Sequence, residues 1–189
     1  MTIFHRLKFM NQNNKGVTLI ELLMAMAVIG IIMGSITTAI SQVFNLNTRT
    51  SNHMIAVRQV QNAGYWVSHD ALMAQSGSAN TTGNGFPLVL NWTEWDNGQN
   101  KVITYTLENA SGGLKNLRRT YSIDSGSGPV VQTNFLVGQY IRYNPSDPTL
   151  TSCNFTSSKL SFTVTATVGS GSKAESETRK YEVNPRPGS

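Results

Sequence analysis

One uninterrupted apolar segment dominates the first quarter of the chain. Residues 22–40 are 19 positions without a charge, which as an α-helix would be about 28 Å long and could cross a bilayer. Residues 1–16 before this segment are polar and basic, and the next charge after it is Arg49. Because the positive charge precedes the segment, we expect the amino end to stay in the cytoplasm and the remainder of the chain to be exported.

The pattern becomes amphipathic between residues 45 and 75. Small or apolar residues recur there at helical spacing, at Met54, Val57, Val60, Gly64, Val67 and Ala71. We therefore predict one helix over residues 17–75, with a transmembrane half at 17–44 and an amphipathic half at 45–75. Such a helix would be about 89 Å long, so its second half needs a sheet to cover.

Short alternating segments follow a loop at residues 76–85, whose Gly, Ser, Asn and Thr residues should end the helix. Strands are predicted at 86–92, 101–107, 117–123, 135–143, 160–168 and 178–183. Turns are expected at residues 96–98, 111–113 and 169–172, and an irregular tail at 184–189. The predicted fold class is α+β, a long N-terminal helix packed on an antiparallel β-sheet domain at 76–189.

Charge gives little support to a nucleic-acid partner. The net charge is +5, but three of the 15 basic residues precede Val17, which leaves 12 basic against 10 acidic residues beyond it. The pairs Arg118-Arg119 and Arg179-Lys180 lie in predicted strands, where one neighbour of each pair faces solvent. A nucleic-acid partner is therefore disfavoured.

A lone carboxylate, Glu21, lies at the start of the apolar segment. A charge at the bilayer centre costs roughly 2.5 to 3.5 kcal/mol, so Glu21 is a functional candidate that needs a partner. A secretory signal cleaved near Ala39, or a plain signal anchor, would leave it unexplained. Cleavage between Gly16 and Val17 would create an α-amine, with a reference pKa of about 7.7 to 8.0, four residues before the carboxylate. Alternatively, Glu21 pairs with the Val17 amine of a neighbouring chain, which predicts a polymer.

Gly16 and the following V-T-L-I-E-L-L-M-A-M-A-V-I-G-I-I resemble the cleavage and methylation segment of type IV pilins and pseudopilins. The resemblance implies that residues 1–16 are a leader, that prepilin peptidase cuts after Gly16, that Val17 is N-methylated and that Glu21 is the assembly carboxylate. It also implies partners: other pilin or pseudopilin subunits, the peptidase, an inner-membrane assembly platform and, before assembly, membrane lipid. Most mature members begin with Phe or Met, so Val17 is a departure.

Gly30 and Gly34 form a G-x-x-x-G spacing within the apolar half. This spacing allows another helix to approach closely in lipid. The alternative is that they are two glycines that weaken the helix by up to about 1 kcal/mol each. Residues 17–86 contain no proline, so any local unwinding on assembly would fall to these glycines.

The remaining candidate residues favour structural roles. His53 and His69 are 16 residues apart on the predicted helix, which suits neither a catalytic triad nor a shared metal. We expect no enzyme activity, no metal site and no cofactor. Turn roles, rather than calcium binding or catalysis, are expected for Glu94, Asp96, Asn97, Asp124, Asp147 and the loop 126–128.

Two residue types complete the set of candidates. Cys153 is the only cysteine, and a part-buried thiol is favoured over an intermolecular bridge. Of the three tryptophans, Trp66 and Trp92 suit packing between helix and sheet, whereas Trp95 lies near a predicted hairpin tip and is the better candidate for exposure.

The predicted function is that of a structural subunit, a minor one, of a type IV pilus or a type II secretion pseudopilus. Residues 65–72, 102–119 and 181–185 are loosely similar to minor pilins and J-type pseudopilins, whereas Glu21 argues against a K-type tip role. The alternative is a binding module exposed at a filament tip, either an adhesin or a DNA-uptake protein. The expected location is the inner membrane, followed by a surface or periplasmic filament.

Overall fold

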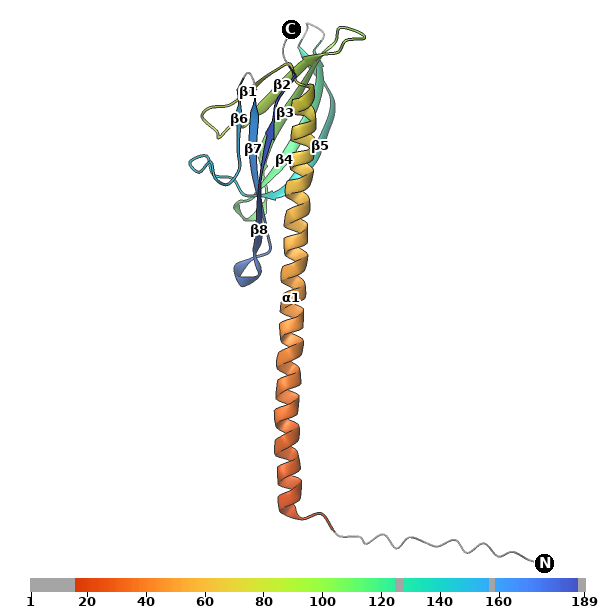
Figure 1. Ribbon diagram of the computed structural model, residues 1–189, viewed down its shortest axis with the longest axis vertical. Coiled ribbons are helices and arrows are strands. Elements are labelled where there is room, and N and C mark those ends of the chain that lie inside the picture. Colours follow the sequence, from red (N-terminus) through yellow and green to blue (C-terminus); the bar gives the residue numbers. More distant parts are fainter. Residues whose placement is uncertain (1–15, 125–127, 157–158, 187–189) are drawn as a thin grey trace, which may run out of the picture. The chain divides into compact units, whose positions relative to one another are not determined.

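The computed structural model describes residues 16–124, 128–156 and 159–186 (Figure 1). The predicted leader 1–16, the loop 126–128 and the tail 184–189 therefore lie wholly or partly outside the described residues. One long helix, α1 (Leu19–Met73), is followed by strands that form an antiparallel sheet. The chain divides into two compact units, Met1–Phe44 and Asn45–Ser189.

Eight strands make up the sheet in the described part of the chain. They are β1 (Ser76–Ala79), β2 (Leu88–Thr93), β3 (Asn100–Asn109), β4 (Lys115–Asp124), β5 (Pro129–Ile141), β6 (Ser152–Phe155), β7 (Leu160–Val168) and β8 (Glu175–Val183). Their order is β1-β2-β3-β4-β5-β7-β6, and β8 pairs with the other edge of β7. Every pairing is antiparallel, so the predicted α+β class with an antiparallel sheet is confirmed.

The six predicted strands are all present, but two short strands were missed. β1 occupies the first part of the predicted loop, and β6 lies in a stretch where no strand was expected. Both are four residues long and gain order from their neighbours, since β1 pairs with β2 and β6 with β7. β5 begins at Pro129 rather than at residue 135, and α1 ends at Met73 rather than at residue 75.

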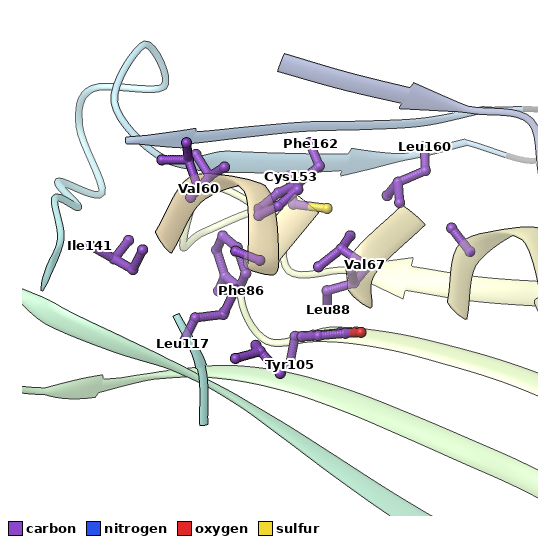
Figure 2. Close-up of a cluster of buried hydrophobic side chains, with 14 of the residues drawn as sticks. Val60, Val67, Phe86, Leu88, Tyr105, Leu117, Ile141, Cys153, Leu160 and Phe162 are labelled. Carbon is purple, nitrogen blue, oxygen red and sulfur yellow. The ribbon is translucent and has the colours of Figure 1, made fainter. Parts of the chain in front are cut away.

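The second half of α1 forms the centre of the hydrophobic core. Val60 and Val67 are fully buried among Phe86, Leu88 and Phe162 of the sheet domain (Figure 2). The buried residues of the helix are Ala56, Val60, Ala63, Gly64, Val67, Asp70 and Ala71. The predicted cover of the sheet by this half is therefore confirmed.

Met54 was wrongly placed on the buried face. Its side chain is 58% exposed, and the small side chains of Ala56 and Ala63 are buried instead. The packing is closest at Gly64, where an added Cβ would lie 2.0 Å from the Tyr181 ring. Where helix and strand approach this closely, only small residues fit.

Side-chain hydrogen bonds fasten the helix to both flanks of the sheet. Asn62 donates to the Val137 carbonyl at 2.7 Å, and the Gln59 amide oxygen accepts from the Gln139 backbone N–H at 2.8 Å. These two bonds satisfy backbone groups of β5. On the other flank the Tyr181 hydroxyl of β8 donates to the Val60 carbonyl at 3.1 Å.

Candidate processing and assembly segment

The first turn of α1 is capped by the Thr18 side chain. The Glu21 backbone N–H donates to Thr18 Oγ1 at 3.3 Å, and the Thr18 hydroxyl donates to Glu21 Oε2 at 3.4 Å. Thr18 is thus the N-cap, and T-x-x-E is the sequence signature of a capping box. This local role was not predicted, although the spacing of the two residues would have revealed it.

Gly16 and Val17 precede the helix without regular secondary structure. Both are exposed, with Val17 at 72%. A Cβ built at Gly16 would meet nothing within 4 Å. The described contacts therefore give no folding reason for a glycine at this position, and the 16–17 bond is accessible in the described structure.

The helix between Leu19 and Phe44 presents apolar side chains that are exposed throughout. An 18-residue window of α1 has a mean hydropathy of 2.3, so by length and composition this helix is apolar enough to cross a membrane. Its hydroxyl side chains bond within the helix: Ser35, Thr37, Thr38 and Ser41 each donate to the carbonyl four residues earlier, at 2.9 to 3.0 Å. Such internal bonds suit a helix in lipid, where water is not available.

Glu21 is the one charged side chain between Val17 and Arg49. Among the described residues, Thr18 is the side chain that hydrogen-bonds to it. The carboxylate also lies in the first turn, where the helix dipole favours negative charge. The cap and the dipole account for its place in the helix, but neither supplies a cation.

Gly30 and Gly34 both lie within α1, and the space beside each of them is empty. A Cβ at either position would meet nothing within 4 Å outside the helix's own backbone. The contacts described for this chain therefore require neither glycine. Close packing against another helix stays a prediction.

A second carboxylate, Asp70, is buried near the other end of the same helix. It is 2% exposed and accepts two hydrogen bonds from Arg119 of β4, from Nε at 2.6 Å and from Nη2 at 2.9 Å. The Tyr105 hydroxyl of β3 donates to the same carboxylate. Burial raises the pKa of Tyr105, and the negative charge of Asp70 raises it further. The carboxylate is thus fully partnered by groups of the sheet.

Aromatic rings surround the cation of this buried pair. The Arg119 guanidinium lies 5.2 Å from the centre of the Trp66 ring and 5.4 Å from that of Phe135. Arg118, its neighbour in sequence, is 31% exposed and forms an ion pair with Glu108, which is 47% exposed. Arg119 is therefore the inward member of the basic pair and fixes the helix against β4, whereas Arg118 faces outward.

The other candidate residues have structural surroundings. Trp66 and Trp92 are partly buried against the core, as predicted, and Trp95 is 99% exposed, also as predicted. In the predicted turn at 96–98, Asn97 Oδ1 accepts from the Gln99 N–H at 2.9 Å, and Glu94 pairs with Lys101. Asp147 accepts from the N–H and hydroxyl of Thr149 in a turn, and these bonds lower its pKa.

Cys153 and the two histidines have surroundings that differ in exposure. Cys153 is 6% exposed, and burial raises the pKa of its thiol to about 12. His53 and His69 lie on exposed positions of α1. Among the described residues, no three His, Cys, Asp or Glu side chains converge on a point that could hold a metal ion.

The fold and the N-terminal segment together define a class of protein: a helix that could anchor in a membrane, continuous with the core helix of an antiparallel α+β domain. The sequence matches the prokaryotic N-terminal methylation motif over residues 11–37. The chain therefore carries the signature of the type IV pilins and pseudopilins, a family of structural subunits. No significant match was found among curated proteins or among solved structures.

Proposed function

We propose that this chain is a structural subunit of a type IV pilus or of a type II secretion pseudopilus. In this proposal prepilin peptidase cuts between Gly16 and Val17, and the new Val17 amine is methylated. The apolar half of α1 first anchors the subunit in the inner membrane, with the sheet domain outside. The subunit then enters a filament through that helix. The coarser part, a pilin-like filament subunit, is supported by the methylation motif.

The observation that carries the proposal is the motif over residues 11–37, which contains the Gly16-Val17 junction and Glu21. The structure supports it in two ways. The junction is exposed and lies just before a capped helix, and the side chains that follow are apolar without cover from the described part of the chain. A helix of this kind needs lipid or other helices around it.

The proposed role of Glu21 is a charge contact made after cleavage. Before the cut, Thr18 is its described hydrogen-bond partner. After the cut, the Val17 amine of the same chain lies four residues before Glu21. The Val17 amine of a neighbouring chain is the other cation available. When lipid or neighbouring helices surround the segment, a carboxylate without such a cation would be costly, so the pairing favours the assembled state.

The alternative function is a binding module at a filament tip. Trp95 favours it, since a fully exposed indole next to a turn is available for contact with a ligand or partner. A DNA-uptake role has less support, because many basic side chains of the sheet domain are paired with carboxylates: Lys101, Arg118, Arg119, Lys159, Arg179 and Lys180.

Mass spectrometry of the chain purified from membranes and from sheared filaments tests the proposal. The expected N-terminal peptide begins at Val17 and carries one extra methyl group. A Gly16→Leu variant is the matched control. It should remain uncut, because the proposed cut needs a glycine at this position, and it should fold normally, because a Cβ there would meet nothing within 4 Å. An intact bond between residues 16 and 17 in the wild-type chain would overturn the proposal.

A further inference from the structure

The first half of β5 is an exposed strand with one unpaired edge. Residues 129–134 are all exposed, including Val130 and Val131 at 59% and 58%. Their partner is β4; in the described residues β7 joins β5 only at the Ile141–Ala166 pair. The helix side chains that bond to β5 reach Val137 and Gln139 and not this half. Unpaired strand edges readily take up another strand.

The absence of charge distinguishes this edge from β8. β5 has no charged residue in 13 positions, whereas β8 has five in nine. A strand without charge can pair with a charged strand without placing like charges opposite each other, so the edge of β5 is open to pairing even with an edge such as that of β8. An uncharged strand can also enter an apolar site without leaving a charge unpaired.

An apolar groove of about 460 Å³ lies between α1 and β8. Its helix side includes Gly64, Tyr65, Ser68 and Leu72, and its strand side includes Tyr181. Gly64 has no side chain, which lets the Tyr181 ring pack directly against the helix, and both residues line the groove. Tyr65 and Leu72 are large apolar side chains that are more than half exposed. Exposed apolar surface of this kind commonly marks a contact site.

The groove accepts an uncharged strand by length and by charge. Its helix side runs from Gln61 to Leu72, about 17 Å along the axis, and six residues of strand span about 20 Å. Two of its lining residues can carry charge: Arg179, which is paired with Glu177, and His69, which lies near Asp70. β8 has β7 as its strand partner in the described residues, so its other edge has backbone groups to offer.

We propose that residues 129–134 of one copy add as a strand to the free edge of β8 in a second copy and place a valine side chain in the groove. The inference rests on the proposed filament function. Strand and groove are different surfaces of one molecule, so the contact is head-to-tail. Such a contact repeats along a filament instead of closing into a dimer.

Disulfide trapping in the native host tests the contact. Full-length chains with Ser68→Cys or Val131→Cys, each with a different tag, are expressed together and oxidised in intact filaments. The expected main product is mixed and joins one Ser68→Cys chain to one Val131→Cys chain through the two introduced thiols. Ser146→Cys, at an exposed position in the loop after β5, replaces Ser68→Cys in the control. Native Cys153 is buried and stays in place.

A second variant tests the chemistry of the groove. Leu72→Asp in the Ser68→Cys copy should lower the mixed product by at least roughly tenfold, because the added strand would have to remove water from the introduced carboxylate. Leu72 is exposed, so the thermal unfolding of this variant should be close to that of the wild type.

Three outcomes would overturn the inference while leaving the proposed function intact. The first is a processed, filament-borne chain whose mixed product does not exceed the Ser146→Cys control. The second is a predominant product that joins two Val131→Cys chains, which would show like edges pairing with each other. The third is crosslinking to other proteins alone. Failure of the proposed function is read separately, as an intact bond between residues 16 and 17.

Discussion

Small and apolar side chains are nearly continuous in the first half of α1 and form one face of the second half, and the two halves have opposite surroundings. From Leu19 to Phe44 every residue is exposed in the described structure, whereas Val60 and Val67 of the second half are fully buried. The sheet covers the second half, so that half contributes to the core of its own domain. The first half must obtain its cover from lipid or from other chains, which is the requirement of an assembly helix.

Each half of the helix has one carboxylate near its end, and the two carboxylates differ in their partners. Asp70 shows what a buried carboxylate on this helix requires, namely a bidentate Arg119 and the Tyr105 hydroxyl. Glu21 has a threonine hydroxyl in the described structure. If neighbouring helices bury Glu21, it will need a cation of the same kind, and the amine made by cleavage is the nearest one available.

The largest expected effect concerns Arg119. Arg119→Ala should lower the free energy of unfolding by about 3 to 5 kcal/mol, because it leaves Asp70 buried without its cation. Arg118→Ala is the matched control and should cost less than about 1 kcal/mol, because its pair with Glu108 is at the surface. Urea titration of the full-length chain in detergent, followed by tryptophan fluorescence, measures both. Equal losses would remove the distinction between the buried and surface pairs.

A glycine in each half of the helix gives the next test. Gly64→Ala should destabilise the sheet domain by about 1 to 3 kcal/mol, because its Cβ would collide with the Tyr181 ring. A Cβ at residue 34 would meet nothing within 4 Å in the described structure. Gly34→Ala should therefore not lower the free energy of unfolding, since alanine is more favourable than glycine in a helix by up to about 1 kcal/mol.

The same two variants are then compared for incorporation into filaments. If helices pack closely at Gly34, Gly34→Ala enters filaments less well although its domain is as stable as the wild type. A Gly64→Ala domain as stable as the wild type would contradict the described contact between helix and β8.

The smallest expected effect concerns a carboxylate at the surface. Hydrogen bonds from Lys159 and Lys180 lower the pKa of Glu182 to about 2, from an ordinary 4.5. A pKa that is lower in the folded state stabilises the fold above pH 4.5, and this contribution is lost as the pH falls towards 2. Glu182→Gln should therefore differ from the wild type at about pH 7 and converge with it near pH 2, as followed by thermal unfolding. A constant difference across this range would contradict the pairing.

Local patterns predicted most of this fold, because periodicity is a property of neighbouring residues. The helix and six of the strands could be read in this way. β1 and β6 could not, since their short sequences Ser-Gly-Ser-Ala and Ser-Cys-Asn-Phe gain order from pairing with strands elsewhere in the chain.

The buried ion pair could not be read from either of its segments alone. Asp70 follows the spacing of the buried Ala63 and Val67, but a carboxylate there reads as surface until Arg119 is known to face it. For the processing segment, Gly16, Val17 and Glu21 came from the resemblance, and the structure adds the Thr18 cap. The partner of Glu21 in an assembly stays a prediction, because that contact would form only when other chains are present.

Glu21 is proposed to act through its charge, and Glu21→Gln separates that charge from the helix cap. Glutamine can replace glutamate in a capping box, so the start of the helix is kept while the charge is lost. The measurement is the fraction of processed chain recovered in sheared filaments, compared with the wild type at equal processing and equal unfolding free energy. We predict normal cleavage at Gly16 and a large loss of incorporation. Incorporation equal to that of the wild type would contradict the account.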